Sequence, residues 1–391
     1  MALIHEQLSE QFFRWEQRGR GWQVYAEPVR LEPPFRPYYG NFLPSTRHPD
    51  DGLKPRIWNQ LLSRLGQLAK PKSAPSPAQD ETETEPEPIL LVREPLVELQ
   101  VSLPADLDIA RESFEQIFRN LCQCHEPVSF ELLGTAKRVV AQFAASAADA
   151  PIVRRQLAAH FPDVEFRQKI GALEKAWEDG SGDMACALEF GLEREFMYPL
   201  ATGKLDPFIG IIAALAELQP GELALFQVLM QGTHSEWPES ILRSVTHADG
   251  KPFFVNEPEL THAAQTKIAR PLYAAVVRIL VRTATTSRLH EITRELAGAL
   301  RAFANPQGNA LIPLQNDDYP FLKHIEDVLR RQSCRSGMIL NSDELTGFVH
   351  LPSNAVRSPA LLRDSGRTKA AHRRPRGPGH CQSPHLPTET N

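Results

Sequence analysis

The segment 128–144 reads VSFELLGTAKRVVAQFA and predicts two β-strands joined by a short turn. From Val128 to Leu132 apolar and polar residues alternate, which is the period of a strand with one buried face. Gly134 marks the predicted turn, and Arg138 to Ala144 gives the second strand. A lone hairpin is only marginally stable in water, so the segments on both sides of it decide the fold class.

Strand and helix patterns flank this hairpin in a regular order. Residues 96–103 alternate as a strand, and apolar residues recur at helical spacing over 114–121 after Asp108, a residue type that caps helices. Downstream, Asp149 opens a second helix, and 164–167 closes with a short strand. The order βαββαβ is that of ferredoxin-like units, and it predicts an α+β fold.

The stretch 171–316 repeats this order of elements without repeating the residues. Its predicted strands lie at 188–192, 222–230, 272–281 and 310–314, and its helices follow Asp206 and Ser287. A polar, proline-containing insertion at 232–270 separates the two middle strands. The sequence therefore predicts two ferredoxin-like βαββαβ units in tandem, at 96–170 and 171–316.

Composition sets the remaining boundaries. An N-terminal aromatic and basic arm with a helix near 55–68 occupies 1–70. Residues 71–95 form a linker, because they include PKSAPSPAQDETETEPEP, which has no large apolar residue to offset the entropy cost of ordering. A helix and connector follow at 317–371. The tail 372–391 is rich in Pro, Arg and His, and we expect it to be disordered.

The charge balance excludes a uniformly basic protein that coats nucleic acid. Charged residues make up 23% of the 391 residues, and the formal net charge is −5. Five cysteines are too few and too scattered for a disulfide framework. No run approaches the roughly 20 apolar residues of a membrane helix, and the amino end lacks the pattern of a secretion signal. We therefore expect a cytoplasmic protein without a membrane span.

The sequence carries no recognisable catalytic, cofactor or metal motif. G-x-x-x-x-G-K-[ST] is absent, and the nearest fragments, at 202–204 and 250–251, lack the glycine that lets backbone amides wrap a phosphate. Neither H-E-x-x-H nor G-x-S-x-G occurs. Cys122, Cys124 and His125 are too closely spaced for a standard zinc half-site, and no second half-site exists. We expect no catalytic, cofactor-binding or metal-binding residue in this chain.

Aromatic residues alternate with arginines near the amino end, in Trp15, Arg18, Arg20 and Trp22. This pattern suits stacking on bases together with contact to phosphates. The alternative is an arm that packs its aromatic side chains on a neighbouring domain. The sequence leaves both interpretations open.

A second basic group, Arg330, Arg331 and Arg335, follows a predicted helix and enters a glycine turn. Guanidinium groups in this position can grip a phosphate or contact a protein partner. Alternatively, they complement the negative end of the helix dipole.

Several short sequence segments of the chain, which we call phrases, resemble the region ahead of the motor domain in conjugative and type IV secretion DNA-transfer ATPases of the FtsK–HerA superfamily. The resemblance is to coupling-protein-like or HerA-helicase-like members that lack membrane helices, and it covers Gln11 to about Ala371. The matching phrases are RWEQRGRGW, PVRLEPPF, SLPAD, PVSFELLG, AAHFP, EFGLEREFMYPL, GELALFQVLMQ and, above all, RRQSCRSGMILNSDELTGFVHLPSNAVRSP.

The resemblance implies a non-catalytic role. In such proteins the chain continues after a segment like 367–371 into a RecA-like motor, whose P-loop binds ATP and Mg²⁺. Here a low-complexity tail follows instead, so we expect an amino-terminal fragment truncated by a frameshift near residue 371. The fragment itself is then no enzyme, whereas its full-length parent is an ATPase. The resemblance implies that this fragment takes part in ring assembly and docks protein partners. Contact with DNA would be made through the full-length parent.

Two other functions stay open. One is a stand-alone scaffold or adaptor of a secretion or mobile-element system. The other is a nucleic-acid-binding module that uses the aromatic arm and the arginines near Arg330. The fragment hypothesis also predicts exposed apolar surface at 339–349, and with it a tendency to aggregate.

Overall fold

The computed structural model describes residues 2–38, 86–92, 94–104, 111–202, 206–247, 250–252 and 258–363. The predicted helix near 55–68, most of the linker at 71–95, Asp108 and the tail 372–391 lie outside these residues. Within the described ranges, no helix is both long and apolar enough to cross a membrane.

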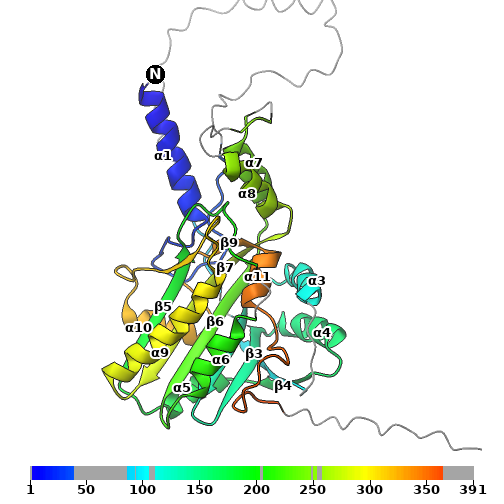
Figure 1. Cartoon of the computed structure of the whole chain (residues 1–391), viewed down its shortest axis with the longest axis vertical. Coiled ribbons are helices and arrows are strands. Elements are labelled where there is room, and N and C mark those ends of the chain that lie inside the picture. Colours follow the sequence, from blue (N-terminus) through cyan, green and yellow to red (C-terminus); the bar gives the residue numbers. More distant parts are fainter. Residues whose placement is uncertain are drawn as a thin grey trace, which may run out of the picture.

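The described strands form one antiparallel sheet in the order β4-β1-β3-β2-β6-β7-β5-β8, with β9 added beside β7 (Figure 1). Their bounds are β1 Leu96–Ser102, β2 Val128–Thr135, β3 Arg138–Ser146, β4 Glu165–Lys169, β5 Met184–Leu192, β6 Leu223–Gly232, β7 Leu272–Thr283, β8 Leu311–Pro313 and β9 Met338–Asn341. β2 pairs with β6 along its whole length, with Val128 opposite Met230 and Thr135 opposite Leu223. This pairing joins the strands of 96–170 to those of 171–316 in a single sheet.

Each strand and helix predicted within 96–316 has a counterpart, but the turn of the first hairpin is displaced. It lies at 136–137, and Gly134 is inside β2. A Cβ built at Gly134 would come within 2.9 Å of the Leu215 Cβ. Glycine at this position therefore lets a helix pack closely on the strand, rather than turning the chain.

Helices cover both faces of the sheet. Their bounds are α1 Ala2–Arg18, α3 Arg111–Leu121, α4 Ala150–His160, α5 Ala172–Asp179, α6 Phe208–Ala216, α7 Trp237–Val245, α8 Pro258–Ile268, α9 Thr286–Ala299, the 3-10 helix η1 Leu300–Phe303, α10 Phe321–Leu329 and α11 Ser342–Phe348. The sequence does not predict α1, which it gives only as an aromatic and basic arm, nor α5, α7, α8 or α11. Of these, α7 and α8 lie in the insertion at 232–270, whose polar composition is typical of a loop.

The larger core lies between one face of the sheet and α3, α4, α6 and α9, and Figure 1 shows α6 and α9 in front of the strands. Phe130 on β2, Phe208 on α6 and Phe226 on β6 form part of it, and the rings of Phe130 and Phe208 stack with centroids 5.6 Å apart. A smaller apolar cluster lies on the opposite face, where Leu173 of α5 and Val328 of α10 join residues of the strands. This second face carries the candidate site.

The apolar residues of 339–349 are buried, so the expectation of exposed apolar surface there is wrong. Ile339, Leu345 and Phe348 are each 0% exposed. The strand β9 pairs with β7, with Leu340 opposite Tyr273, and α11 packs against α3. The segment therefore completes the core of this chain.

Candidate functional site

A row of polar side chains crosses the second face of the sheet. Glu131 on β2 lies opposite Gln142 on β3 and Gln227 on β6. Gln227 lies opposite Arg278 on β7, which lies opposite Glu189 on β5. All five side chains, which we call the polar row, are 0% exposed. Because buried charges are costly unless they are paired and hydrogen-bonded, such a row requires partners.

Members of the polar row first bond to one another. Gln142 Nε2 and Gln227 Nε2 donate to the two carboxylate oxygens of Glu131, at 2.6 and 2.7 Å. Arg278 Nε donates to Gln227 Oε1, and its Nη1 lies 3.5 Å from Glu189 Oε1. These contacts connect five neighbouring strands through their side chains.

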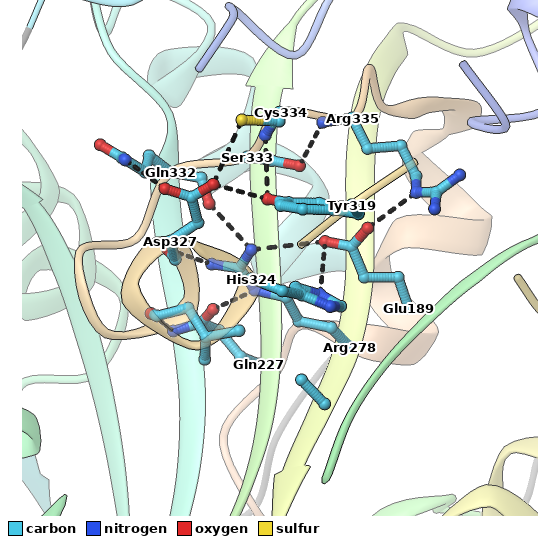
Figure 2. A network of polar contacts seen from close by, with 12 residues as sticks. Glu189, Gln227, Arg278, Tyr319, His324, Asp327, Gln332, Ser333, Cys334 and Arg335 are labelled. Atoms are coloured by element: carbon cyan, nitrogen blue, oxygen red, sulfur yellow. Dashed lines mark hydrogen bonds and ion pairs between the residues drawn. The ribbon is translucent and has the colours of Figure 1, made fainter. Parts of the chain in front are cut away.

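Residues 319–337, which we call the covering segment, lie over the polar row and include α10. Three backbone carbonyls of this segment accept hydrogen bonds from the row (Figure 2). Gln227 Nε2 donates to Val328 O at 3.1 Å, and Arg278 donates to Asp327 O at 3.0 Å and Gln332 O at 2.8 Å. Asp327 O and Val328 O also accept backbone N–H groups of Gln332 and Arg331, so the row adds a second donor to each and ties the end of α10 to the sheet.

The side chain of Arg331 extends from the covering segment to carboxylates on the face of the sheet. Its Nε donates to Glu131 Oε1 at 2.9 Å, and its Nη2 bonds to Glu98 on β1. Glu98 also accepts from the backbone N–H of Leu173 at 3.0 Å, at the start of α5. Arg331 is the one non-glycine residue with positive φ in the described part of the chain, at 53°. That left-handed backbone costs about 1–2 kcal/mol, and it persists here because the ion pairs with Glu131 and Glu98 hold Arg331 in place.

Arg335 holds the other end of the covering segment. Its Nε donates to Glu189 Oε2 at 2.8 Å, and its Nη1 donates to Trp22 O at 2.7 Å. His324 Nε2 lies 3.4 Å from Glu189 Oε1. Burial alone would raise the pKa of Glu189, but the hydrogen bond and charge of His324, with Arg278 and Arg335, lower it to about 2. Glu189 is therefore an anion near neutral pH.

A hydrogen-bonded group around Asp327 completes the covering segment. Tyr319 Oη donates to Asp327 Oδ2 at 2.8 Å, and Cys334 Sγ lies 3.2 Å from the same oxygen. The Cys334 backbone N–H donates to Tyr319 Oη at 3.0 Å. Burial and the nearby Asp327 charge raise the pKa of the Cys334 thiol to about 12. The thiol is thus protonated near neutral pH and lacks the thiolate of a nucleophilic cysteine.

The arrangement clamps the covering segment to the sheet. Its ionisable groups are buried and paired with one another. Across the described residues, no group of three or more His, Cys, Asp or Glu side chains is arranged to hold a metal ion.

The predicted arginines near residue 330 separate into two kinds. The guanidinium groups of Arg331 and Arg335 are buried and bind carboxylates, and Arg331 Nη1 also donates to Leu329 O at 2.9 Å, at the end of α10. That contact matches the alternative of an arginine complementing the helix end. The Arg330 side chain is 45% exposed and pairs with Glu326. Phosphate or partner contact therefore stays a prediction that rests on Arg330.

A surface hollow of about 330 Å³ lies beside these arginines. Its charged lining residues are Arg330, Arg331, Glu94, Glu98, Glu126 and Glu174. Burial, Glu94 and Asp149 raise the pKa of Glu126, as expected where carboxylates gather. With more carboxylates than guanidinium groups, this hollow does not favour an anionic ligand.

Trp15 of the aromatic arm packs inside the protein. It is 3% exposed, and its ring centroid lies 5.1 Å from that of Phe196 and 5.7 Å from that of Tyr38. Trp237 of α7 belongs to the same aromatic cluster. This arrangement matches the alternative of an arm that packs its aromatic residues on neighbouring parts of the fold.

The remaining arm residues lie at the end of α1. Arg20 binds Glu16 through two hydrogen bonds, of 2.6 and 2.8 Å, and its guanidinium lies 4.7 Å from the centre of the Trp22 ring. Burial raises the pKa of Glu16 to about 7, against the opposing effect of Arg20. Arg18 is 6% exposed, whereas Trp22 is half-buried. Base or phosphate contact stays a prediction for this group.

The polar row and Glu98 are functional candidates that the motif search missed. A signal exists for four of the six residues, because Gln142, Glu189, Gln227 and Arg278 each interrupt an apolar strand, whereas Glu98 and Glu131 lie in alternating strands. Gln227 lies within LALFQVLM and Arg278 within AAVVRILV, where both faces of the strand are otherwise apolar. A charged or amide side chain inside such a strand indicates a buried polar partner, although it does not identify that partner.

Comparisons with known proteins give no family or activity that can be assigned to this chain. No protein-family model and no curated protein matches the chain. Among the solved structures, it is similar to a single-residue variant of berberine bridge enzyme, described as a reticuline dehydrogenase, at 12% identity and a TM-score of 0.26. The match covers 56% of this chain and 43% of the enzyme, and a similarity this weak supports neither its fold nor its activity for this protein.

Proposed function

We propose that this chain is the non-catalytic assembly and docking region ahead of the motor in a DNA-translocating ATPase of conjugative transfer or type IV secretion. The proposal begins with the resemblance of its phrases to the FtsK–HerA superfamily. One observation supports it most. The phrases that carry the resemblance lie far apart in the sequence, yet they contact one another in the fold.

Three of these phrases meet at Arg335. The phrase RWEQRGRGW joins EFGLEREFMYPL because the Leu192 N–H donates to Arg20 O at 3.1 Å. Arg335, in RRQSCRSG, then binds the side chain of Glu189 and the carbonyl of Trp22, one residue in each of the other two phrases. These contacts pack the segments into one unit around the buried Arg335–Glu189 pair, which supports an assembly region rather than a reaction centre.

We further propose that the sheet consists of two ferredoxin-like units in tandem. If the four strands of each half are numbered in chain order, the first half, β4-β1-β3-β2, has the spatial order 4-1-3-2. The second half, β8-β5-β7-β6, has the same spatial order. Each half has the βαββαβ sequence of elements, with α7 and α8 inserted in the second. The two second strands, β2 and β6, pair at the centre. This supports an internal two-fold repeat.

Self-association and ATP turnover of the purified chain test the proposal. An assembly region forms oligomers whose mass, measured by light scattering after size exclusion, rises with protein concentration. The same preparation releases no phosphate from ATP, with or without DNA. Phosphate release that follows the chain through purification, or a strictly monomeric chain at every concentration, would overturn the assignment.

A further inference from the structure

Three carboxylates in the surface hollow of about 330 Å³ beside Arg330 have no ion-pair partner among the described residues. They belong to Glu94, Glu126 and Glu174. The guanidinium groups of the lining, those of Arg330 and Arg331, are already paired with other glutamates. The uncompensated negative charge of this hollow therefore favours a cationic ligand.

The three carboxylates converge from separate parts of the fold. Glu94 precedes β1, Glu126 precedes β2, and Glu174 lies in the first turn of α5. Glu174 also suits the positive end of the helix dipole, so its position alone indicates no ligand. Glu126 has no such explanation. Burial, Glu94 and Asp149 raise its pKa, whereas Arg30 lowers it. A cation in the hollow would relieve this repulsion between carboxylates.

A buried carboxamide in the lining gives an independent indication of a ligand. Gln332 is 1% exposed and lines the hollow. Its Nε2 donates to Asp327, whereas its Oε1 has no hydrogen-bond donor among the described residues. Figure 2 shows this oxygen turned away from Asp327. Since a buried acceptor without a donor is costly, the hollow calls for a ligand that brings N–H or O–H groups as well as positive charge.

The apolar part of the lining narrows the class of cation. It consists of Leu91, Pro95, Leu96, Pro127 and Ile170, and no aromatic ring occurs in the described lining. Such walls suit the methylene chain of an alkylammonium, as they do the stem of a lysine side chain. A metal ion fits less well, because no group of three or more metal-binding side chains is arranged to hold one in the described part of the chain.

We propose that this hollow binds a linear aliphatic polyamine, with its ammonium groups on Glu94, Glu126 and Glu174 and its methylene chain against the apolar lining. One of its N–H groups supplies the donor that Gln332 Oε1 lacks. A lysine of a protein partner has a similar stem but a single ammonium, whereas the hollow presents carboxylates from three segments. Its volume of about 330 Å³ is at the small end of ligand pockets. The inference goes beyond the proposed function and does not depend on it.

Isothermal titration of the full chain with spermidine at low salt tests the site. We expect saturable binding that Glu126→Gln weakens about tenfold, as the loss of a charged hydrogen-bond partner does. Glu174→Gln, at a more exposed position, should weaken it about threefold. Neither side chain forms a hydrogen bond with a described residue, so both variants should keep the melting temperature of the unmodified chain.

Glu178→Gln is the matched control. It removes the same charge from an exposed position on α5, one helical turn beyond Glu174 and outside the described lining. It should change the dissociation constant by less than about twofold, because exposed charges outside the site are screened by salt. Equal weakening by Glu126→Gln and Glu178→Gln would overturn the proposal, since it would indicate diffuse charge attraction.

Related cations separate the alternatives. Putrescine should bind more tightly than butylamine, which has the same number of carbons but a single ammonium. Equal binding of these two amines would overturn the proposal, and so would the absence of saturable spermidine binding. Displacement of spermidine by an equal concentration of Mg²⁺ would overturn it in favour of non-selective cation binding. A lysine-rich peptide that binds more tightly than spermidine, and is lost in Glu126→Gln, would overturn it in favour of a basic protein partner.

Discussion

Arg331 and Glu131 form a buried ion pair across the interface between the covering segment and the sheet, with Arg331 Nε 2.9 Å from Glu131 Oε1. They are 200 residues apart in the sequence, and their side chains are 3% and 0% exposed. Burial would raise the pKa of Glu131, but Arg331 and the hydrogen bonds from Gln142 and Gln227 lower it. The pair is therefore charged, and it fixes where the covering segment lies on the sheet.

Replacing Arg331 should strongly destabilise the fold. Arg331→Met leaves Glu131 and Glu98 buried without their cation, and breaking a buried pair in this way costs about 3–5 kcal/mol. The loss is measured as the free energy of unfolding in urea. Arg330→Ala, at the neighbouring exposed position, should change that free energy by less than about 0.5 kcal/mol. Similar losses for the two variants would contradict the role given to the buried pair.

Acid should weaken the fold through Glu189. The ordinary pKa of this carboxyl is 4.5, and in the fold it is about 2, so the unfolded chain binds its proton first. The stability that Glu189 contributes is complete above pH 4.5 and is lost as pH falls towards 2. The free energy of unfolding, followed over this range, should fall less steeply in Glu189→Gln. An unchanged slope in the variant would show that other carboxyls cause the acid sensitivity.

Cys334 should resist alkylation while the protein is folded. Its thiol is 1% exposed and has a pKa of about 12, so very little thiolate forms near neutral pH. Peptide mapping after iodoacetamide treatment should find Cys334 unmodified in buffer and modified in urea. Rapid modification in buffer would mean that the covering segment opens readily.

Gly19 should be intolerant of a side chain. A Cβ at this position would lie 2.3 Å from a ring atom of Phe196, a side chain that is 0% exposed. Gly19→Ala should therefore lower the free energy of unfolding by about 1–3 kcal/mol, the usual cost of overpacking. Gly298→Ala is the control, because a Cβ there has no neighbour within 4 Å. Since Gly298 is in α9, that change should stabilise the protein by up to about 1 kcal/mol.

Local pattern was sufficient to predict strands β1 to β8, but neither β9 nor the way in which the strands come together. Alternation within VSFELL indicates a strand, yet it does not show that Glu131 faces Gln227, 96 residues later. The same limit applies to the arginines. Arg335 follows a helix in the sequence, as a phosphate-binding arginine would, but its carboxylate partner Glu189 lies 146 residues earlier. Partners separated in this way follow from strand register and chain topology, which no short motif encodes.

The helices that the sequence did not predict have a similar explanation. α8 reads PELTHAAQTKI, with few large apolar residues to mark a buried face. It is held by tertiary contact with α7, whose Trp237 is fully buried in the aromatic cluster with Trp15. Packing of this kind outweighs weak local preference.

The nucleotide sequence of the locus tests the central claim most directly. If the chain is the region ahead of a DNA-translocating motor, a reading frame beyond codon 371 encodes G-x-x-x-x-G-K-[ST] within about one domain length, roughly 100–200 residues. We predict that translation of all three frames finds it. The absence of this motif and of any remnant of the motor in every frame would contradict the account.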